Sequence, residues 1–262
     1  MLRTVRNAAS RVAHLVLGSV PMRVCSGPNR GMRWIVAAGV HKCWLGTYEA
    51  EKMKAIAMLA RPGMTLYDVG AHSGFYTLLF SRLTGTEGKV YSFEPCAQNV
   101  GFLLRHIWLN EIGNVRVVQS ALAEVSGLHP MSVDRGRYEN CLCAEQETPL
   151  LVPTMTLDTF KGEAPDLIKI DVEGAEGKVL RGASRILSEA RPGLFLALHG
   201  EEQRQDCTVL LRAMDYGLYT LDGNQVEGPI LTDEIVALPI GSAAERIWVS
   251  RYPANPVTHA PI

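Results

Sequence analysis

The chain has 262 residues, of which 47% are hydrophobic and 20% are charged, and its formal net charge is -1. This length suits one α/β domain with short additions, and the composition is typical of a soluble globular protein. The balanced charge excludes the strongly basic class that binds nucleic acid, so we expect no nucleic-acid partner. The six cysteines form no pair at zinc-ligand spacing, which indicates reduced thiols rather than a zinc site.

Basic charge is concentrated at the N-terminus, where residues 1–48 hold seven lysines or arginines and no acid. We interpret residues 1–43 as a basic extension, and we assign the basic charge of residues 1–33 to docking or surface attachment rather than chemistry. It is expected to be a solvated helix packed on the domain, with a peripheral contact to an anionic membrane surface or partner as the alternative. Residues 12–20 are apolar but lack a signal-peptide cleavage site, and no run is long enough to span a bilayer. We therefore expect a cytoplasmic protein.

The remaining residues, 44–262, are predicted to form one domain in which helices and strands alternate. Residues 48–59 carry apolar side chains near a 3.6-residue period, which predicts a helix that ends at Arg61-Pro-Gly63. Three apolar runs predict strands at 64–69, 89–93 and 115–119. The periodic segments after the first two predict helices at 75–83 and 97–110.

Residues 124–157 break this alternation. Two β-prone pieces, 129–133 and 150–155, flank a polar stretch, which predicts a small inserted β-hairpin or lid. Alternation then resumes towards the C-terminus. The patterns predict strands at 167–170, 194–198, 218–221 and 246–250, and helices at 175–189 and 201–215.

Alternating strands and helices indicate an α/β fold with a mostly parallel sheet covered by helices on both faces. In such sheets ligands bind beyond the carboxyl ends of the strands. Functional residues are therefore expected directly after each predicted strand.

A glycine-bearing turn follows the first of these strands. Gly70 and Gly74 allow the backbone to approach a ligand closely, and the next helix presents unpaired N–H groups there. Asp68 suits a ligand that carries a sulfonium and an ammonium group, whereas it would repel a pyrophosphate. The turn also lacks the GxGxxG pattern of dinucleotide-binding proteins.

A carboxylate ends the second strand, at Glu94, 20 residues beyond Gly74. Such a carboxylate can accept hydrogen bonds from both ribose hydroxyls of a nucleoside that lies over the glycine turn. The glycine turn and Glu94 together indicate an adenosine ligand and leave open whether this is S-adenosylmethionine or NAD.

The fourth strand places Asp171 and Glu173 at the same predicted edge, with Glu176 on the first turn of the next helix. Glu176 is explained by its favourable position at a helix N-terminus. His199 follows the fifth strand and is expected near Asp171, where an imidazole could take up a proton.

Several motifs together resemble the FkbM family of methyltransferases in order and spacing, over residues 44–199. His72, Ala97 and His106 depart from that pattern, in which asparagine, proline and asparagine are common. The matching motifs are Trp44-Leu-Gly-Thr-Tyr-Glu49, Asp68-Val-Gly-Ala-His-Ser-Gly-Phe-Tyr-Thr77, Phe93-Glu-Pro95, Thr156-Leu-Asp158, Ile168-Lys-Ile-Asp-Val-Glu-Gly-Ala-Glu176 and Val179-Leu-Arg-Gly-Ala183.

The resemblance implies a Rossmann-like methyltransferase fold, S-adenosylmethionine as the methyl donor, and O-methylation of a sugar, polyketide or other small hydroxylated metabolite. His199 and Asp171 are the expected catalytic residues, and we expect no metal, although Asp171, Glu173 and His199 together would permit a divalent ion. Tyr48, Glu173 and Tyr138 are expected to bind the acceptor. The expected donor-binding residues are Asp68, Gly70, His72, Gly74, Tyr76, Thr77, Glu94, Ser120, Ala121 and Asp171.

Two other functions stay open at this point. One is a methyltransferase-like binding protein without catalysis. The other is an NAD-dependent oxidoreductase, which Asp68 and the missing GxGxxG pattern disfavour. The sequence gives no indication of the oligomeric state.

Overall fold

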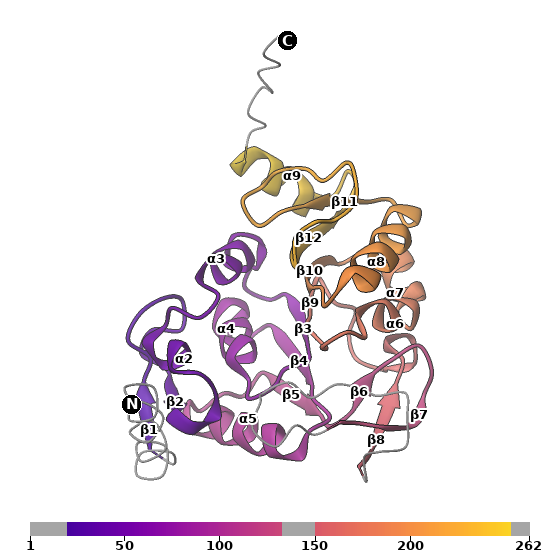
Figure 1. Ribbon diagram of the computed structural model, residues 1–262. Coiled ribbons are helices and arrows are strands. Elements are labelled where there is room, and N and C mark those ends of the chain that lie inside the picture. Colours follow the sequence, from indigo (N-terminus) through magenta and orange to yellow (C-terminus); the bar gives the residue numbers. More distant parts are fainter. Residues whose placement is uncertain (1–19, 133–149, 253–262) are drawn as a thin grey trace, which may run out of the picture.

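A computed structural model describes residues 20–132 and 150–252 (Figure 1). Its centre is a seven-stranded sheet in the order β11-β12-β10-β9-β3-β4-β5. The five strands from β10 to β5 are parallel, and β12 pairs antiparallel with both β10 and β11. The strand bounds are Thr65–Val69 (β3), Lys89–Phe93 (β4), Val115–Val118 (β5), Leu167–Ile170 (β9), Gly193–Ala197 (β10), Tyr216–Tyr219 (β11) and Glu234–Pro239 (β12).

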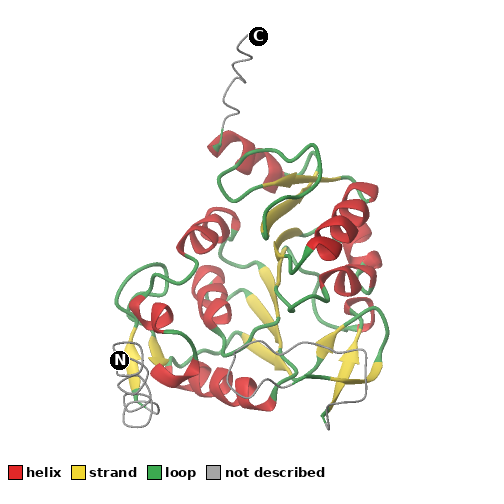
Figure 2. Cartoon of the chain, in the orientation of Figure 1, coloured by secondary structure: helices red, strands yellow, loops and turns green. Residues whose placement is uncertain are grey.

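Helices cover both faces of this sheet (Figures 1 and 2). One apolar core forms between the sheet and α3, α4 and α9, and a second forms between the sheet and α6, α7 and α8. The expected α/β Rossmann-like architecture is therefore confirmed. The helix bounds are Ala50–Leu59 (α3), Phe75–Thr84 (α4), Ala97–Leu109 (α5), Glu176–Arg181 (α6), Ser184–Glu189 (α7), Glu201–Ala213 (α8) and Ala243–Arg251 (α9).

The strand order reverses between β3 and β9, which are neighbours near the middle of the sheet. The chain runs outward from β3 to β4 and β5 on one side, and from β9 to β10 on the other. A crevice opens at such a reversal because the two connecting segments leave in opposite directions. The strand order thus places a binding site beyond Val69 and Ile170, where the sequence patterns located it.

The predicted insertion is a small separate sheet that contains β6 (Ala121–Leu122), β7 (Gly127–Pro130) and β8 (Leu151–Met155). The antiparallel pairing of β7 with β8 confirms the hairpin, and β6 adds a parallel strand at its edge. The polar stretch between these strands, including Tyr138, lies outside the described residues.

Two predicted elements differ in the structure. The single helix expected at 175–189 is divided into α6 and α7, because the backbone leaves the helical conformation at Ala183, with φ of -119° and ψ of 13°. A Cβ at the preceding Gly182 would lie 2.1 Å from the carbonyl oxygen of Ala123, so the chain packs closely at this break. Asp158 then caps the second piece, accepting hydrogen bonds from the backbone N–H groups of Arg185 and Ile186. This gives the Thr156-Leu-Asp158 motif a structural role.

The prediction of a strand at 246–250 is wrong, since these residues lie in α9. Ser242 caps this helix by accepting from the N–H of Glu245, and Glu245 accepts in return from Gly241. A serine followed three residues later by glutamate is a helix-start pattern. The closing strand is β12, whose residues from Ile235 to Pro239 are all buried.

The N-terminal segment, residues 20–48, packs against α4 and α5 (Figure 1). It contains β1 (Pro21–Arg23), β2 (Arg33–Ile35), a 3-10 turn (Val36–Ala38) and α2 (His41–Leu45). Trp34 and Ile35 are 1% and 0% exposed and belong to the same core as α3 and α4. The described part of the expected basic extension is therefore integral to the core.

Within residues 20–132 and 150–252, no helix has the length and apolar character required to cross a bilayer.

Candidate active site

A cavity of about 490 Å³ lies beyond the carboxyl ends of β3, β4 and β9. The glycine turn (residues 68–77) and Glu94 border it on one side, and Asp171 and Glu173 border it on another. The N-terminal segment supplies a further wall through Trp34 and the residues of the following turn. Residues 34–43 of the expected basic extension thus contribute to the cavity, whereas none of the described residues before Trp34 lines it.

The glycine turn depends on backbone conformations that side chains disfavour. Gly70 has φ of +73°, and a Cβ there would lie 1.8 Å from the carbonyl oxygen of Asp171. Any other residue would therefore push the turn away from β9. His72 also adopts a left-handed conformation, with φ of +48°. Burial, followed by the charge of Lys169, lowers the pKa of His72 to about 4, so its imidazole is neutral.

Glu94 is 5% exposed and lies at the cavity wall. One carboxylate oxygen accepts from the backbone N–H of His72 at 2.8 Å, and the other accepts from Cys96 N–H at 2.9 Å and from the Asn99 amide at 3.1 Å. Burial raises the pKa of Glu94 despite these bonds. A carboxylate has about four lone-pair positions. Glu94 thus fixes the glycine turn and keeps acceptor capacity for a ligand.

Lys169 is the positive centre of the site. It is 3% exposed, donates to the carbonyl of Gly70 at 2.9 Å, and lies 3.6 Å from the Asp68 carboxylate and 3.5 Å from that of Asp171. Burial alone would raise the pKa of Asp171, but the charge of Lys169, with smaller contributions from Lys52 and His199, holds it below its usual value. Asp171 therefore faces the cavity as a carboxylate.

Asp68 lies behind the turn rather than at the cavity. It is fully buried, and burial raises its pKa. One oxygen accepts from the hydroxyl of Thr77 at 2.6 Å, while the other has no hydrogen-bond partner in the described residues. The hydroxyl of Thr77 in turn contacts Ser92 at 2.8 Å. Asp68 and Thr77 thus join the turn to the sheet, and neither lines the cavity.

His199 stands among three carboxylates. Its Nδ1 lies 2.9 Å from buried Glu176, and its Nε2 lies 3.3 Å from Glu173 and 3.9 Å from Asp171. The hydrogen bond with Glu176 raises the pKa of His199 to about 9, against the opposing effect of partial burial. The imidazole is therefore charged at neutral pH. This replaces the ordinary value near 6.5 that the sequence alone would suggest.

A titration tests this charge state. We expect the pKa of His199, followed by NMR of its ring, to be near 9 and to fall towards 6.5 in Glu176→Gln. Because the folded-state pKa is raised, His199 stabilises the fold fully below about pH 6.5, and this contribution is lost as the pH rises to about 9. Melting temperatures of wild type and His199→Gln should therefore converge above pH 9. A wild-type titration near 6.5 would contradict the assignment.

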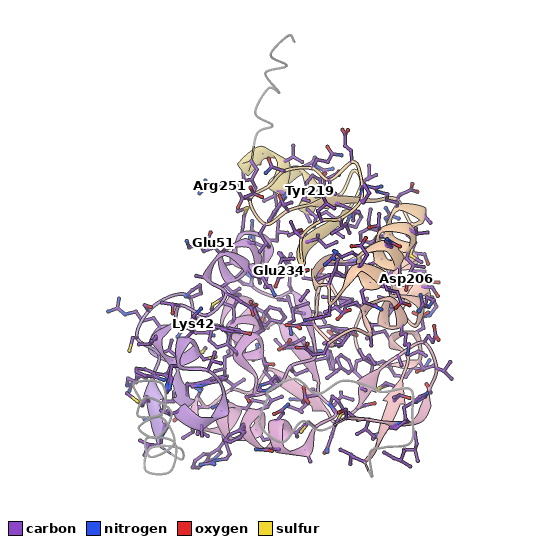
Figure 3. The ribbon with its side chains drawn as sticks, viewed as in Figure 1. Lys42, Glu51, Asp206, Tyr219, Glu234 and Arg251 are labelled. Atoms are coloured by element: carbon purple, nitrogen blue, oxygen red, sulfur yellow. The ribbon has the colours of Figure 1, made fainter. Side chains whose placement is uncertain are left out.

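A second buried lysine, Lys52, forms ion pairs behind the cavity wall. Lys52 is 2% exposed and bridges Glu49 at 2.8 Å to Glu234 at 2.5 Å, which ties α3 to the start of β12. Figure 3 marks the position of Glu234. The hydroxyl of Tyr76 donates to Glu49 at 2.5 Å. The pKa of Glu234 is raised to about 7, chiefly by burial. This bridge holds Tyr76 at the cavity.

Most of the residues expected at the site converge on the cavity. Asp68, Gly74, Thr77 and His199 lie beside its wall rather than in it, and Tyr138 lies outside the described residues. Those that line it are Tyr48, Gly70, His72, Tyr76, Glu94, Ser120, Ala121, Asp171 and Glu173.

Lys169 and Trp34 are among the cavity residues that sequence reasoning missed. Lys169 interrupts an otherwise apolar strand, which is a signal for a buried, paired charge. Trp34 has no such signal, because its place at the cavity depends on contacts with α5, more than 60 residues away in sequence.

The fold is that of Rossmann-like methyltransferases. A family model described as the Methyltransferase FkbM domain matches residues 68–219, and the chain belongs to this family. The chain is 27% identical over 165 residues to the 2-O-methyltransferase NoeI of Sinorhizobium fredii, with 52% of this chain and 64% of that protein covered.

Among solved structures, methyltransferase FkbM from Methylobacillus flagellatus superposes with a TM-score of 0.50 at 20% identity. The match covers 71% of this chain and 50% of that one, and it shows a shared fold. The chain therefore spans less than two thirds of the length of each of these two proteins.

Proposed function

We propose that this protein transfers a methyl group from S-adenosylmethionine to a hydroxyl of a small acceptor such as a sugar, a polyketide or a related metabolite. The observation that carries the proposal is the meeting of the glycine turn, Glu94 and Asp171 at one cavity. Membership of the FkbM methyltransferase family supports the reaction class.

The residues present fit this donor. Gly70 lets the glycine turn approach the backbone of Asp171 closely, and Glu94, which already accepts three hydrogen bonds, keeps acceptor capacity at the cavity wall for a ribose hydroxyl. Ser120 and Ala121 border the same cavity, where an adenine ring would lie. The carboxylates of Glu94, Asp171 and Glu173 outnumber the single lysine, Lys169, among the lining residues, and this excess of acidic groups suits a donor that carries a sulfonium and an ammonium group.

Bound S-adenosylmethionine supplies an electrophilic methyl carbon, to which the acceptor oxygen bonds as the carbon–sulfur bond breaks and S-adenosylhomocysteine leaves. The protein's part is to align the hydroxyl and receive its proton. Asp171 lies in the cavity wall and His199 lies beside it, so we assign proton uptake to this pair, with His199 as the base and Asp171 as the orienting group. Tyr48 and Glu173 are assigned to acceptor binding.

O-methylation draws support from the name of the relative NoeI, a 2-O-methyltransferase. We propose that the reaction uses neither a metal nor a nucleic-acid partner. Atoms of Asp171, Glu173 and His199 lie within 4.8 Å of one another, a spacing that a divalent ion could bridge. However, both ring nitrogens of His199 already contact carboxylates.

Donor binding tests the proposal directly. We expect isothermal titration to show that the wild-type protein binds S-adenosylhomocysteine and not NAD. Glu94→Ala and Glu94→Gln should weaken binding at least about tenfold, since hydrogen bonds to a charged acceptor are worth about 1.5–3 kcal/mol each. Glu87→Gln, a change on the exposed turn before β4, is the control.

Thermal denaturation shows whether each variant is folded. Binding of NAD alone would favour the oxidoreductase alternative. Donor binding without turnover on any acceptor would favour a non-catalytic binding protein. An unchanged dissociation constant in folded Glu94→Gln would remove Glu94 from the donor site.

A further inference from the structure

His106 joins the N-terminal segment to the glycine turn. It is 0% exposed, and its Nε2 lies 2.9 Å from the backbone nitrogen of Ile35, while its Nδ1 lies 2.8 Å from the carbonyl oxygen of Ser73. The backbone N–H of Ile35 can only donate, so Nε2 accepts. The proton must then be on Nδ1, which donates to Ser73. Burial lowers the pKa of His106 to about 4, so the ring keeps this neutral form.

Trp34 completes the connection on the cavity side. Its indole stacks on His106 at a centroid distance of 4.1 Å and an interplanar angle of 17°, and it meets Phe75 edge-on at 5.7 Å. Trp34, Ser73 and Phe75 all line the cavity. The indole nitrogen is buried and has no hydrogen-bond partner in the described part of the chain.

The N-terminal segment has other anchors that do not touch the glycine turn. Asn110, one turn after His106 on α5, accepts from the N–H of Arg33 at 2.7 Å and donates to its carbonyl at 2.9 Å. Asn110 therefore secures β2 to α5 in the same way as His106. The two side chains differ in that only His106 continues to Ser73.

We propose that His106 is a positioning residue for the methyl donor. It holds the Ser73 carbonyl in place, and it holds the indole of Trp34 in the part of the cavity wall next to the glycine turn, where the donor would bind. The N-terminal segment is then part of the donor site, although the motifs of that site all lie later in the sequence. This inference rests on the proposed function. It adds a further contact that fixes the glycine turn, besides those of Glu94, Lys169 and the Asp68–Thr77 pair.

Two substitutions at one position separate positioning from bulk packing. A glutamine amide offers one N–H donor and one oxygen acceptor, as the neutral imidazole does, whereas leucine offers neither. His106→Leu is expected to weaken S-adenosylhomocysteine binding about tenfold or more, because the Ser73 carbonyl and the Ile35 N–H lose their partners. His106→Gln is expected to bind within about threefold of wild type.

Asn110→Ala is the matched control, since it loosens β2 from α5 without contact to the glycine turn. All variants are titrated with S-adenosylhomocysteine by calorimetry at a temperature at which circular dichroism shows them folded. We expect Asn110→Ala to bind as wild type does. An equal loss in Asn110→Ala and His106→Leu, or no loss in His106→Leu, would overturn the positioning role.

Tryptophan fluorescence gives a readout that stays available if His106→Leu does not fold. Trp34 is the one tryptophan among the described cavity residues. The change in tryptophan emission on adding S-adenosylhomocysteine is expected in wild type and lost in Trp34→Phe. An undiminished change in Trp34→Phe would overturn the placement of Trp34 at the donor. Failure of wild type to bind S-adenosylhomocysteine would instead reject the proposed function itself.

Discussion

His199→Ala is expected to lower the rate of methyl transfer about 10²- to 10⁴-fold, the range that loss of a general base produces, while donor binding is retained. The assay uses radiolabelled S-adenosylmethionine and the first acceptor that shows turnover in a screen of hydroxylated sugars and polyketides. Because the pKa of His199 is raised to about 9, a base at this position would be charged at neutral pH. Wild-type activity should therefore rise with pH up to about 9.

If Asp171 is the base instead, this rise of activity with pH is not expected. The pKa of its carboxyl is held below the usual value, so Asp171 is ionised throughout that pH range. If Asp171→Asn is inactive but binds donor, and His199→Ala keeps the wild-type rate and profile, Asp171 is the base. If both variants are active, neither receives the proton. Treatment with EDTA serves as a control for the proposed metal-free reaction and is expected to leave the rate unchanged.

Lys169→Met is expected to lower the free energy of unfolding by about 3–5 kcal/mol, the usual cost of removing one partner from a buried ion pair. The substitution keeps the length of the side chain but leaves the carboxylates of Asp68 and Asp171 without their shared cation. Urea denaturation followed by circular dichroism measures the change.

Lys54→Met provides the comparison, since Lys54 pairs with Glu51 at 2.8 Å on α3 but is 66% exposed. Exposed pairs of this kind contribute about 0–1 kcal/mol. Adding Asp68→Asn to Lys169→Met should recover part of the loss, because one uncompensated charge is then removed. A cost for Lys169→Met no larger than that for Lys54→Met would show that the three charges are not coupled to folding.

The sequence predicted the sheet well where strands are apolar runs between turn signals. The segments 89–93 and 167–170 coincide with β4 and β9. Such strands are buried on both faces, so their composition reports their environment directly. The same logic placed Glu94 and Asp171 correctly at one edge.

The features that the sequence did not predict depend on packing between residues far apart in the chain. Residues 175–189 have a continuous helical pattern, and the break at Ala183 lies where Gly182 packs closely on the distant Ala123. The place of Trp34 involves its stacking on His106, and the raised pKa of His199 depends on a buried Glu176. Each of these facts belongs to a pair of residues that are distant in sequence, which local patterns do not report.

The small sheet beside the site has a consequence for protein engineering. In the antiparallel pairing of β7 and β8, Pro130 lies opposite Leu151, so the chain leaves and re-enters this sheet at neighbouring points. Closing a connection between adjacent strand ends costs little more as it is lengthened, with each doubling adding only about 0.6 kcal/mol. A change in the length of the connection between Pro130 and Leu151 is therefore expected to leave the parallel sheet and its glycine turn folded.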